Sequence, residues 1–199
     1  MDSKCGLQHG DKNMDDKNLI EPIIKEYYIK FKAKLNQPSV ENNDFDELMN
    51  LFNISPELKR DNRQFWGRHL GKLWEKMVVE LAKTHCQDFQ PELKINKDQL
   101  CDLIIGSDAI DTKYRIGSGD SGTLKKLKDY GTILQKKGYN PIMLIVRDDN
   151  LPSAIAAAKS RGWNVLTDVE SFSYLKEKIG IDINDLIQEF CNVYHIIDE

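Results

Sequence analysis

The sequence contains few cysteines and no long apolar run. Its 199 residues include four cysteines, at positions 5, 86, 101 and 191, and no CxxC pair. This argues against a disulfide scaffold and a structural zinc site, and it favours a reducing compartment, expected to be the cytoplasm. The longest aliphatic run covers residues 142–146, whereas a membrane-spanning helix needs about 20 apolar residues. The polar first 17 residues lack the apolar core of a secretory signal.

The charge of the chain is nearly balanced overall but uneven along its length. The formal net charge is −4, which argues against non-specific coating of nucleic acid. Between positions 112 and 147, however, eight Lys or Arg residues stand against two Asp. Such a stretch could attract a polyanion locally, although lysines alone more often form the solvated face of a helix.

Periodicity predicts a polar arm, a helical segment and an alternating region. Residues 1–17 predict a mobile arm, and residues 18–64 predict helices that are the candidate dimer interface. From residue 65 to 199 the pattern predicts one α/β domain. Its expected elements are a helix at 65–84, strands at 89–95, 99–105 and 109–116, a helix at 124–137, a strand at 141–146, a helix at 151–161, a strand at 163–166, and helices at 168–178 and 182–192. This order predicts a mixed sheet, with an antiparallel meander followed by crossover units.

The most informative segment is a predicted hairpin around Gly106-Ser107. Glycine at the first central position suits a two-residue type II′ turn. This turn would pair Ile105 with Asp108 and, further along, Asp102 with Asp111. Paired residues on antiparallel strands have Cβ atoms about 4.5–5.5 Å apart, and alternation puts Lys113 on the same face as Asp111. The hairpin therefore predicts two facing carboxylates beside an amine.

Two facing carboxylates repel each other unless a cation lies between them. Mg²⁺ prefers oxygen ligands and is typically held by one or two carboxylates, waters and substrate phosphate. Such an ion can lower the pKa of a bound water and stabilise charge on phosphorus. The ammonium of Lys113 could contact the scissile phosphate and the attacking water. The alternative is a surface hairpin with an ordinary Asp–Lys ion pair, but aspartates are depleted in strands.

With Asp102 and Asp111-Thr112-Lys113 in this hairpin, the sequence resembles the PD-(D/E)xK nuclease superfamily, and within it the type II restriction endonucleases. The resemblance covers roughly residues 65–166 and implies a restriction-endonuclease-like αβββαβ core. It implies that Asp102, Asp111 and the backbone carbonyl of Thr112 bind Mg²⁺, and that Lys113 assists the nucleophilic water. It further implies an acidic residue on the preceding helix, with Glu80 the best match and Glu75 less well placed. Cys101 stands where the family has proline, and Asp replaces Glu in the triplet.

The loop after the third predicted strand is the candidate DNA contact. Arginine can bond guanine and aspartate can accept from cytosine, so the segment from Arg115 to Thr123 is expected to read the target sequence while neighbouring lysines hold the backbone. The candidate DNA-binding residues are Arg115, Ser118, Gly119, Asp120, Ser121, Thr123, Lys125 and Lys126.

The same loop also matches two unrelated motifs. The glycines from Gly117 to Gly122 spell GxGxxG, as in dinucleotide sites, but Asp120 would repel phosphate and the loop does not open a first βαβ unit. The run Gly119-Asp120-Ser121-Gly122 is similar to a serine-protease nucleophile loop, but the all-β pattern of that fold is absent.

The resulting expectation is a Mg²⁺-dependent, sequence-specific endonuclease that cuts double-stranded DNA as a homodimer. A two-fold protein matches a palindromic site and can cut both strands. Two alternatives remain open: a structure-selective repair or junction-resolving nuclease of the same superfamily, and a non-catalytic DNA-binding module.

Overall fold

The computed structural model describes residues 45–117, 121–191, 193 and 196, with only the backbone described at 121–126. The predicted arm at 1–17 and the part of the predicted helical segment before residue 45 lie outside the described residues. The helices are α2 (Glu47–Leu51), α3 (Pro56–Asp61), α4 (Arg63–His85), α5 (Ser121–Lys136), α6 (Pro152–Lys159), α7 (Val169–Ile179) and α8 (Ile183–Gln188). The strands are β1 (Phe89–Gln90), β2 (Leu93–Ile95), β3 (Asp98–Cys101), β4 (Leu103–Ile105), β5 (Asp108–Lys113), β6 (Asn140–Ile145) and β7 (Asn164–Thr167).

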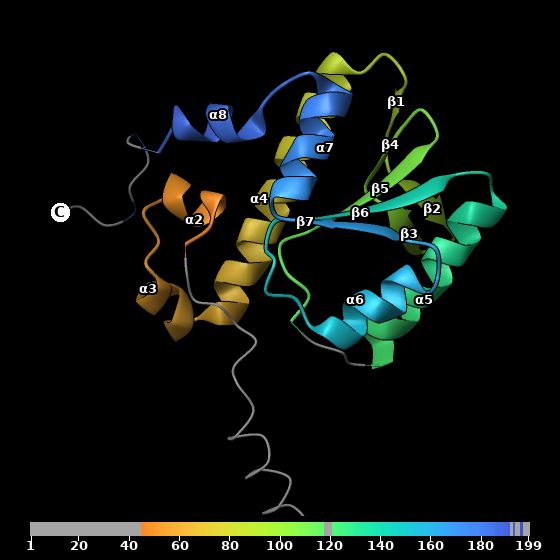
Figure 1. Cartoon of the computed structure of the whole chain (residues 1–199), viewed down its shortest axis with the longest axis horizontal. Helices are drawn as coiled ribbons and strands as arrows, with labels where there is room; N and C mark the ends of the chain where they lie inside the picture. The colour runs from red at the N-terminus through yellow and green to blue at the C-terminus, as the bar shows by residue number, and fades with distance from the viewer. Residues whose placement is uncertain (1–44, 118–120, 192, 194–195, 197–199) are drawn as a thin grey trace, which may run out of the picture. The chain divides into compact units, whose positions relative to one another are not determined.

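Five of these strands form one mixed sheet in the order β1-β4-β5-β6-β7 (Figure 1). Strands β1, β4 and β5 pair antiparallel, whereas β6 pairs parallel to β5 and β7 parallel to β6. The predicted meander followed by crossover units is therefore confirmed, and the chain is an α/β protein. Among the described residues, no helix is long and apolar enough to span a membrane.

Two predicted strands are each divided in two by a local backbone feature. The segment 89–95 splits at Pro91 into β1 and β2, because proline lacks the N–H that a ladder needs. The segment 99–105 splits at Asp102 into β3 and β4. Strands β2 and β3 pair with each other as a separate two-stranded sheet.

Helices cover both faces of the main sheet (Figure 1). An apolar core lies between the sheet and the helices on each face. One core joins α2, α4, α7 and α8 to side chains such as Leu103, Ile110 and Leu144. The other joins α5 and α6 to the opposite side chains of the same strands, including Ile104, Ala109 and Met143. Alternation along β5 thus places Asp111 and Lys113 on the α5 side of the sheet.

Helix α2 is tied to the sheet by a buried charge network. Asp46 caps α2 through the Met49 N–H, and its other oxygen lies 2.6 Å from Nη1 of Arg147, just after β6. The Tyr114 hydroxyl donates to this same oxygen at 2.5 Å. Arg147 also contacts Asp149 at 2.7 Å. Leu48, Met49 and Ile54 are nearly fully buried beside this network, so this part of the candidate dimer interface packs within its own chain.

Replacing Arg147 with alanine is expected to lower the free energy of unfolding by about 3–5 kcal/mol, because it removes the buried guanidinium that pairs with the buried carboxylates of Asp46 and Asp149. The matched control is R60A, which removes an exposed ion pair to Glu57 and should change stability by less than about 1 kcal/mol. Urea unfolding of the variants measures both values. Equal stability of R147A and R60A would contradict a structural role for the network.

Helix α5 closely approaches the connection between α6 and β7 at Gly131. A Cβ at this position would lie 2.6 Å from the Arg161 carbonyl oxygen and 2.7 Å from the Trp163 ring. The Trp163 indole N–H donates to the Leu127 carbonyl at 2.6 Å and holds the helix there. The absence of a side chain at Gly131 therefore sets the distance between α5 and the α6–β7 connection.

Gly131→Ala is expected to destabilise the fold by about 1–3 kcal/mol, because overpacking outweighs the better helix propensity of alanine. Gly67 is the control, since it lies in helix α4 and a Cβ at its position would meet no atom within 4 Å. Gly67→Ala should stabilise the protein by up to about 1 kcal/mol. Thermal unfolding would contradict this packing argument if both substitutions shifted Tm in the same direction.

Candidate active site

The hairpin that carries the predicted acids is formed as expected at its turn. Gly106 has a φ of +58°, a conformation that favours glycine. The ladder pairs Ile105 with Asp108, Ile104 with Ala109 and Leu103 with Ile110, which confirms the predicted register for these three pairs.

Asp102 departs from the predicted register. The chain bends at this residue, and its N–H donates to the Ile110 carbonyl at 2.8 Å instead of continuing the ladder toward Asp111. The Asp102 carboxylate takes the place of the backbone: Oδ2 accepts both the N–H and the hydroxyl of Thr112, each at 2.7 Å. Oδ1 accepts the side-chain amide of Gln99 at 2.8 Å. The carboxylate is therefore held at a fixed orientation across β5.

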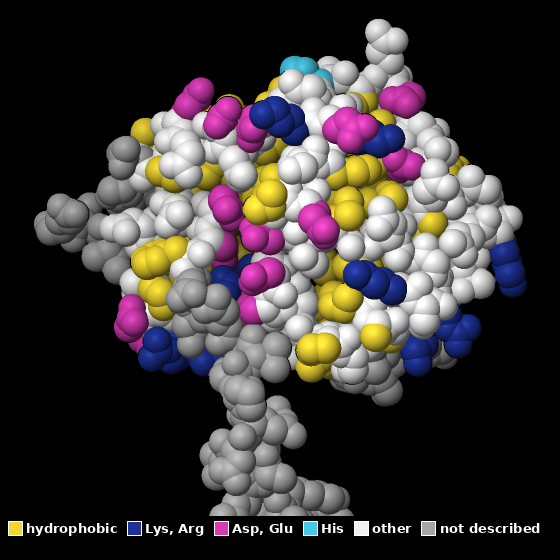
Figure 2. Space-filling view, viewed as in Figure 1, with side chains coloured by type: hydrophobic (Ala, Val, Ile, Leu, Met, Phe, Trp, Pro, Cys, Tyr) yellow, Lys and Arg dark blue, Asp and Glu magenta, His cyan; other side chains and the backbone are white. Residues whose placement is uncertain are grey.

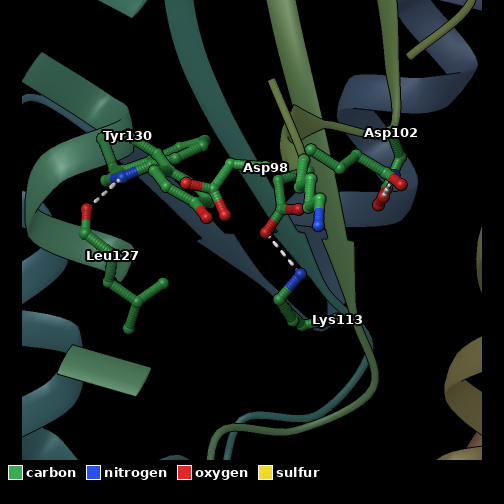
Figure 3. A pocket seen from close by; sticks show the side chains of 9 residues that line it. Asp98, Asp102, Lys113, Leu127 and Tyr130 are labelled. Atoms are coloured by element: carbon green, nitrogen blue, oxygen red, sulfur yellow. Dashed lines mark hydrogen bonds and ion pairs between the residues drawn. The ribbon is translucent and has the colours of Figure 1, made fainter. Parts of the chain in front are cut away.

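Asp102, Asp111 and Lys113 nevertheless line one cavity of about 450 Å³ between the strands and α5 (Figure 3). Lys113 forms an ion pair with Asp111, and its ammonium also donates to the Thr112 carbonyl at 3.0 Å. The structure thus brings together the two acids, the amine and the backbone carbonyl that the sequence predicts to act as a group.

Burial and neighbouring charge shift the pKa values of the central pair. Burial raises the pKa of Asp111 to about 6, and Asp102 adds to the rise although Lys113 opposes it. Burial lowers the pKa of Lys113, but the carboxylates of Asp111, Asp102 and Glu75 outweigh it, so the net pKa lies above the usual lysine value. Lys113 is therefore protonated at neutral pH.

The donor set is consistent with Mg²⁺. The Lys113 ammonium contacts both Asp111 and the Thr112 carbonyl, so these two predicted ligand groups already converge on one cationic centre. The cavity lining carries three carboxylates, of Asp98, Asp102 and Asp111, against the two ammonium groups of Lys97 and Lys113, which leaves an excess of negative charge. Among the described residues, no group of three or more His, Cys, Asp or Glu side chains forms a metal site. A Mg²⁺ ion here would rely on the two carboxylates, the carbonyl and water.

The helix carboxylate near this group is Glu75, whereas Glu80 is not brought to it. Glu75 on α4 acts electrostatically on both Asp111 and Lys113. Glu80 lines a separate apolar groove between α2, α4 and α8, and pairs loosely with Lys83. The reason is the position of the buried stripe of α4, which runs through Leu70, Trp74, Val78 and Ala82 and not through the neighbouring Leu73, Met77 and Leu81. At 100° per residue, Glu75 and Glu80 then project about 140° apart.

Few of the candidate DNA-contacting side chains are described. Arg115 is partly buried and its Nε donates to Asp149 at 3.0 Å, so it is engaged within the fold. Ser118, Gly119 and Asp120 lie outside the described residues, and only the backbone is described for Ser121, Thr123, Lys125 and Lys126 in α5.

The cavity walls contain residues that the sequence does not predict as site residues. Lys97, Asp98 and Gln99 come from the β2–β3 hairpin, and Leu127 and Tyr130 come from α5 (Figure 3). Burial and the neighbouring Asp98 carboxylate raise the pKa of Tyr130, and the two side chains lie close together in the cavity (Figure 3). Their position depends on contacts between distant elements, and no spacing in the sequence indicates it.

Comparison with known proteins finds no matching family model, no matching curated protein and no matching solved structure.

The raised pKa of Asp111 predicts proton-linked Mg²⁺ binding. Below about pH 6 the ion must displace a proton from Asp111, so its apparent affinity should fall, approaching tenfold per pH unit, and it should be nearly constant above pH 7. Isothermal titration calorimetry between pH 5 and 8 measures this dependence. Equal affinities at pH 5 and pH 7 would show that Asp111 is not the ligand that titrates.

Proposed function

We propose that the protein is a Mg²⁺-dependent endonuclease that hydrolyses phosphodiester bonds of double-stranded DNA, in the manner of a type II restriction enzyme. The observation that carries the proposal is the convergence of Asp102, Asp111 and Lys113 in one cavity at the hairpin of a mixed sheet. The order of α4, the three-strand meander, α5 and β6 supports it, because it agrees with the αβββαβ core that the resemblance implies.

Each residue of this group has a defined role in the proposal. Asp102, Asp111 and the Thr112 carbonyl would hold Mg²⁺, which when bound would supply an activated water and neutralise charge on the phosphate. Lys113 is protonated, so it donates a hydrogen bond to a phosphate oxygen or orients the water, and it does not act as the base. A substrate phosphate would compete with Asp111 for the Lys113 ammonium, because the Lys113 side chain is partly exposed.

Binding to DNA is assigned to the basic segment that begins at Lys113. On the face shown in Figure 2, Lys and Arg side chains are scattered among acidic and apolar ones, so the described residues there form no uniformly basic surface. The candidate catalytic strand is followed in the sequence by residues 114–120, which include Arg115, and then by the lysines of α5. A homodimer on a palindromic site completes the proposal, because two copies can cut both strands.

Digestion of a sequenced plasmid tests the proposal. The wild-type protein should produce discrete fragments with Mg²⁺ and none with EDTA, and Lys113→Ala should lower the cleavage rate by about 100-fold or more. Lys176→Ala is the matched control, because it also removes a lysine from an Asp–Lys ion pair but on the exposed surface of α7. This control should cut as wild type does.

The products discriminate between the functions that the sequence leaves open. Nicking confined to branched or damaged substrates would favour a repair or junction-resolving nuclease. Binding of DNA without any cleavage, unchanged in Lys113→Ala, would favour a non-catalytic module. Cleavage that persists in EDTA would contradict a metal-dependent mechanism.

A further inference from the structure

The side chain of Thr112 makes a contact that the proposed chemistry does not require. Thr112 is 5% exposed, and its hydroxyl and its N–H both donate to Oδ2 of Asp102, at 2.7 Å each. A ladder of main-chain bonds would need only the N–H. The hydroxyl adds a second anchor to the same oxygen, on the side of the sheet opposite to Asp111 and Lys113.

The acceptor capacity of Asp102 is almost filled by the chain itself. A carboxylate offers about four lone-pair sites, two on each oxygen. The two Thr112 donors occupy both sites of Oδ2, and Gln99 occupies one site of Oδ1 at 2.8 Å. One lone-pair site remains, on Oδ1 of Asp102, and Asp102 is one of the residues that line the cavity.

We infer that Thr112 makes Asp102 a rigid ligand through one oxygen, and thereby sets the preference of the site for Mg²⁺ over Ca²⁺. The inference rests on the metal site of the proposed function and adds a determinant of ion choice. Mg²⁺ demands near-ideal geometry at short distances and accepts single-oxygen carboxylates, whereas Ca²⁺ takes six to eight oxygens in flexible geometry and often binds both oxygens of one carboxylate. When two hydrogen bonds fix one oxygen of a carboxylate, that carboxylate is disfavoured from binding Ca²⁺ through both of its oxygens.

The test compares Thr112→Val with Thr112→Ser in the full chain without DNA. Valine keeps the β-branched shape and the backbone N–H but removes the hydroxyl, and serine keeps the hydroxyl. Isothermal titration calorimetry with Mg²⁺ and with Ca²⁺ gives the ratio of the two affinities for each protein. Thermal unfolding confirms that each variant is folded, and Thr112→Ala replaces the valine variant if that variant does not fold.

The ratio of Mg²⁺ to Ca²⁺ affinity should fall about three- to tenfold in Thr112→Val, the effect of one hydrogen bond, and should be retained in Thr112→Ser. An unchanged ratio in Thr112→Val would overturn the inference while leaving the metal site in place. Metal binding with the expected ratios but without DNA cleavage would refute the proposed function and leave this inference standing. Absence of binding of either ion to the wild-type chain would refute both.

Discussion

At the centre of this fold, a side-chain carboxylate accepts a hydrogen bond that a backbone carbonyl would accept in a regular ladder. Where the antiparallel ladder between β4 and β5 would continue, Asp102 bends the chain and accepts the Thr112 N–H with its own carboxylate. The bond satisfies a buried donor, and it also fixes a charged group in a sheet that would otherwise exclude it. The division between β3 and β4 falls at this residue, and Asp102 also lines the cavity that contains Asp111.

The two cores explain how a charged pair is tolerated next to buried strands. Residues of β5 that alternate with Asp111, such as Ile110, pack under α4 and α7. On the other side, α5 and α6 cover Ala109 and Met143 but leave the cavity at the position of Asp111 and Lys113. The ion pair is thus partly shielded, which is enough to raise the pKa of Asp111 to about 6.

Local sequence signals predict much of the fold and part of the site. Gly106 identifies the turn, and the turn fixes the register up to Leu103, because a two-residue loop leaves only one pairing. The bend at Asp102 is not predictable in this way, since a polar residue in a strand pattern does not reveal that its carboxylate will replace a backbone acceptor. The sequence pattern also does not fix where Glu75 and Glu80 project, because α4 has apolar side chains on two adjacent stripes and only packing shows which one is buried. Contacts between distant segments leave no local signal either: Asp46 meets Arg147 across 101 residues of sequence, and this contact depends on where whole elements come to lie.

The β2–β3 hairpin contributes Lys97, Asp98 and Gln99 to the cavity wall, and within the described part of the chain its two strands form a sheet of their own. Its length and tip sequence can therefore vary without changing the register of β4 and β5. Evolution or engineering could lengthen, shorten or recharge this projection and so alter which molecules reach the acids, while the strands that carry those acids stay unchanged.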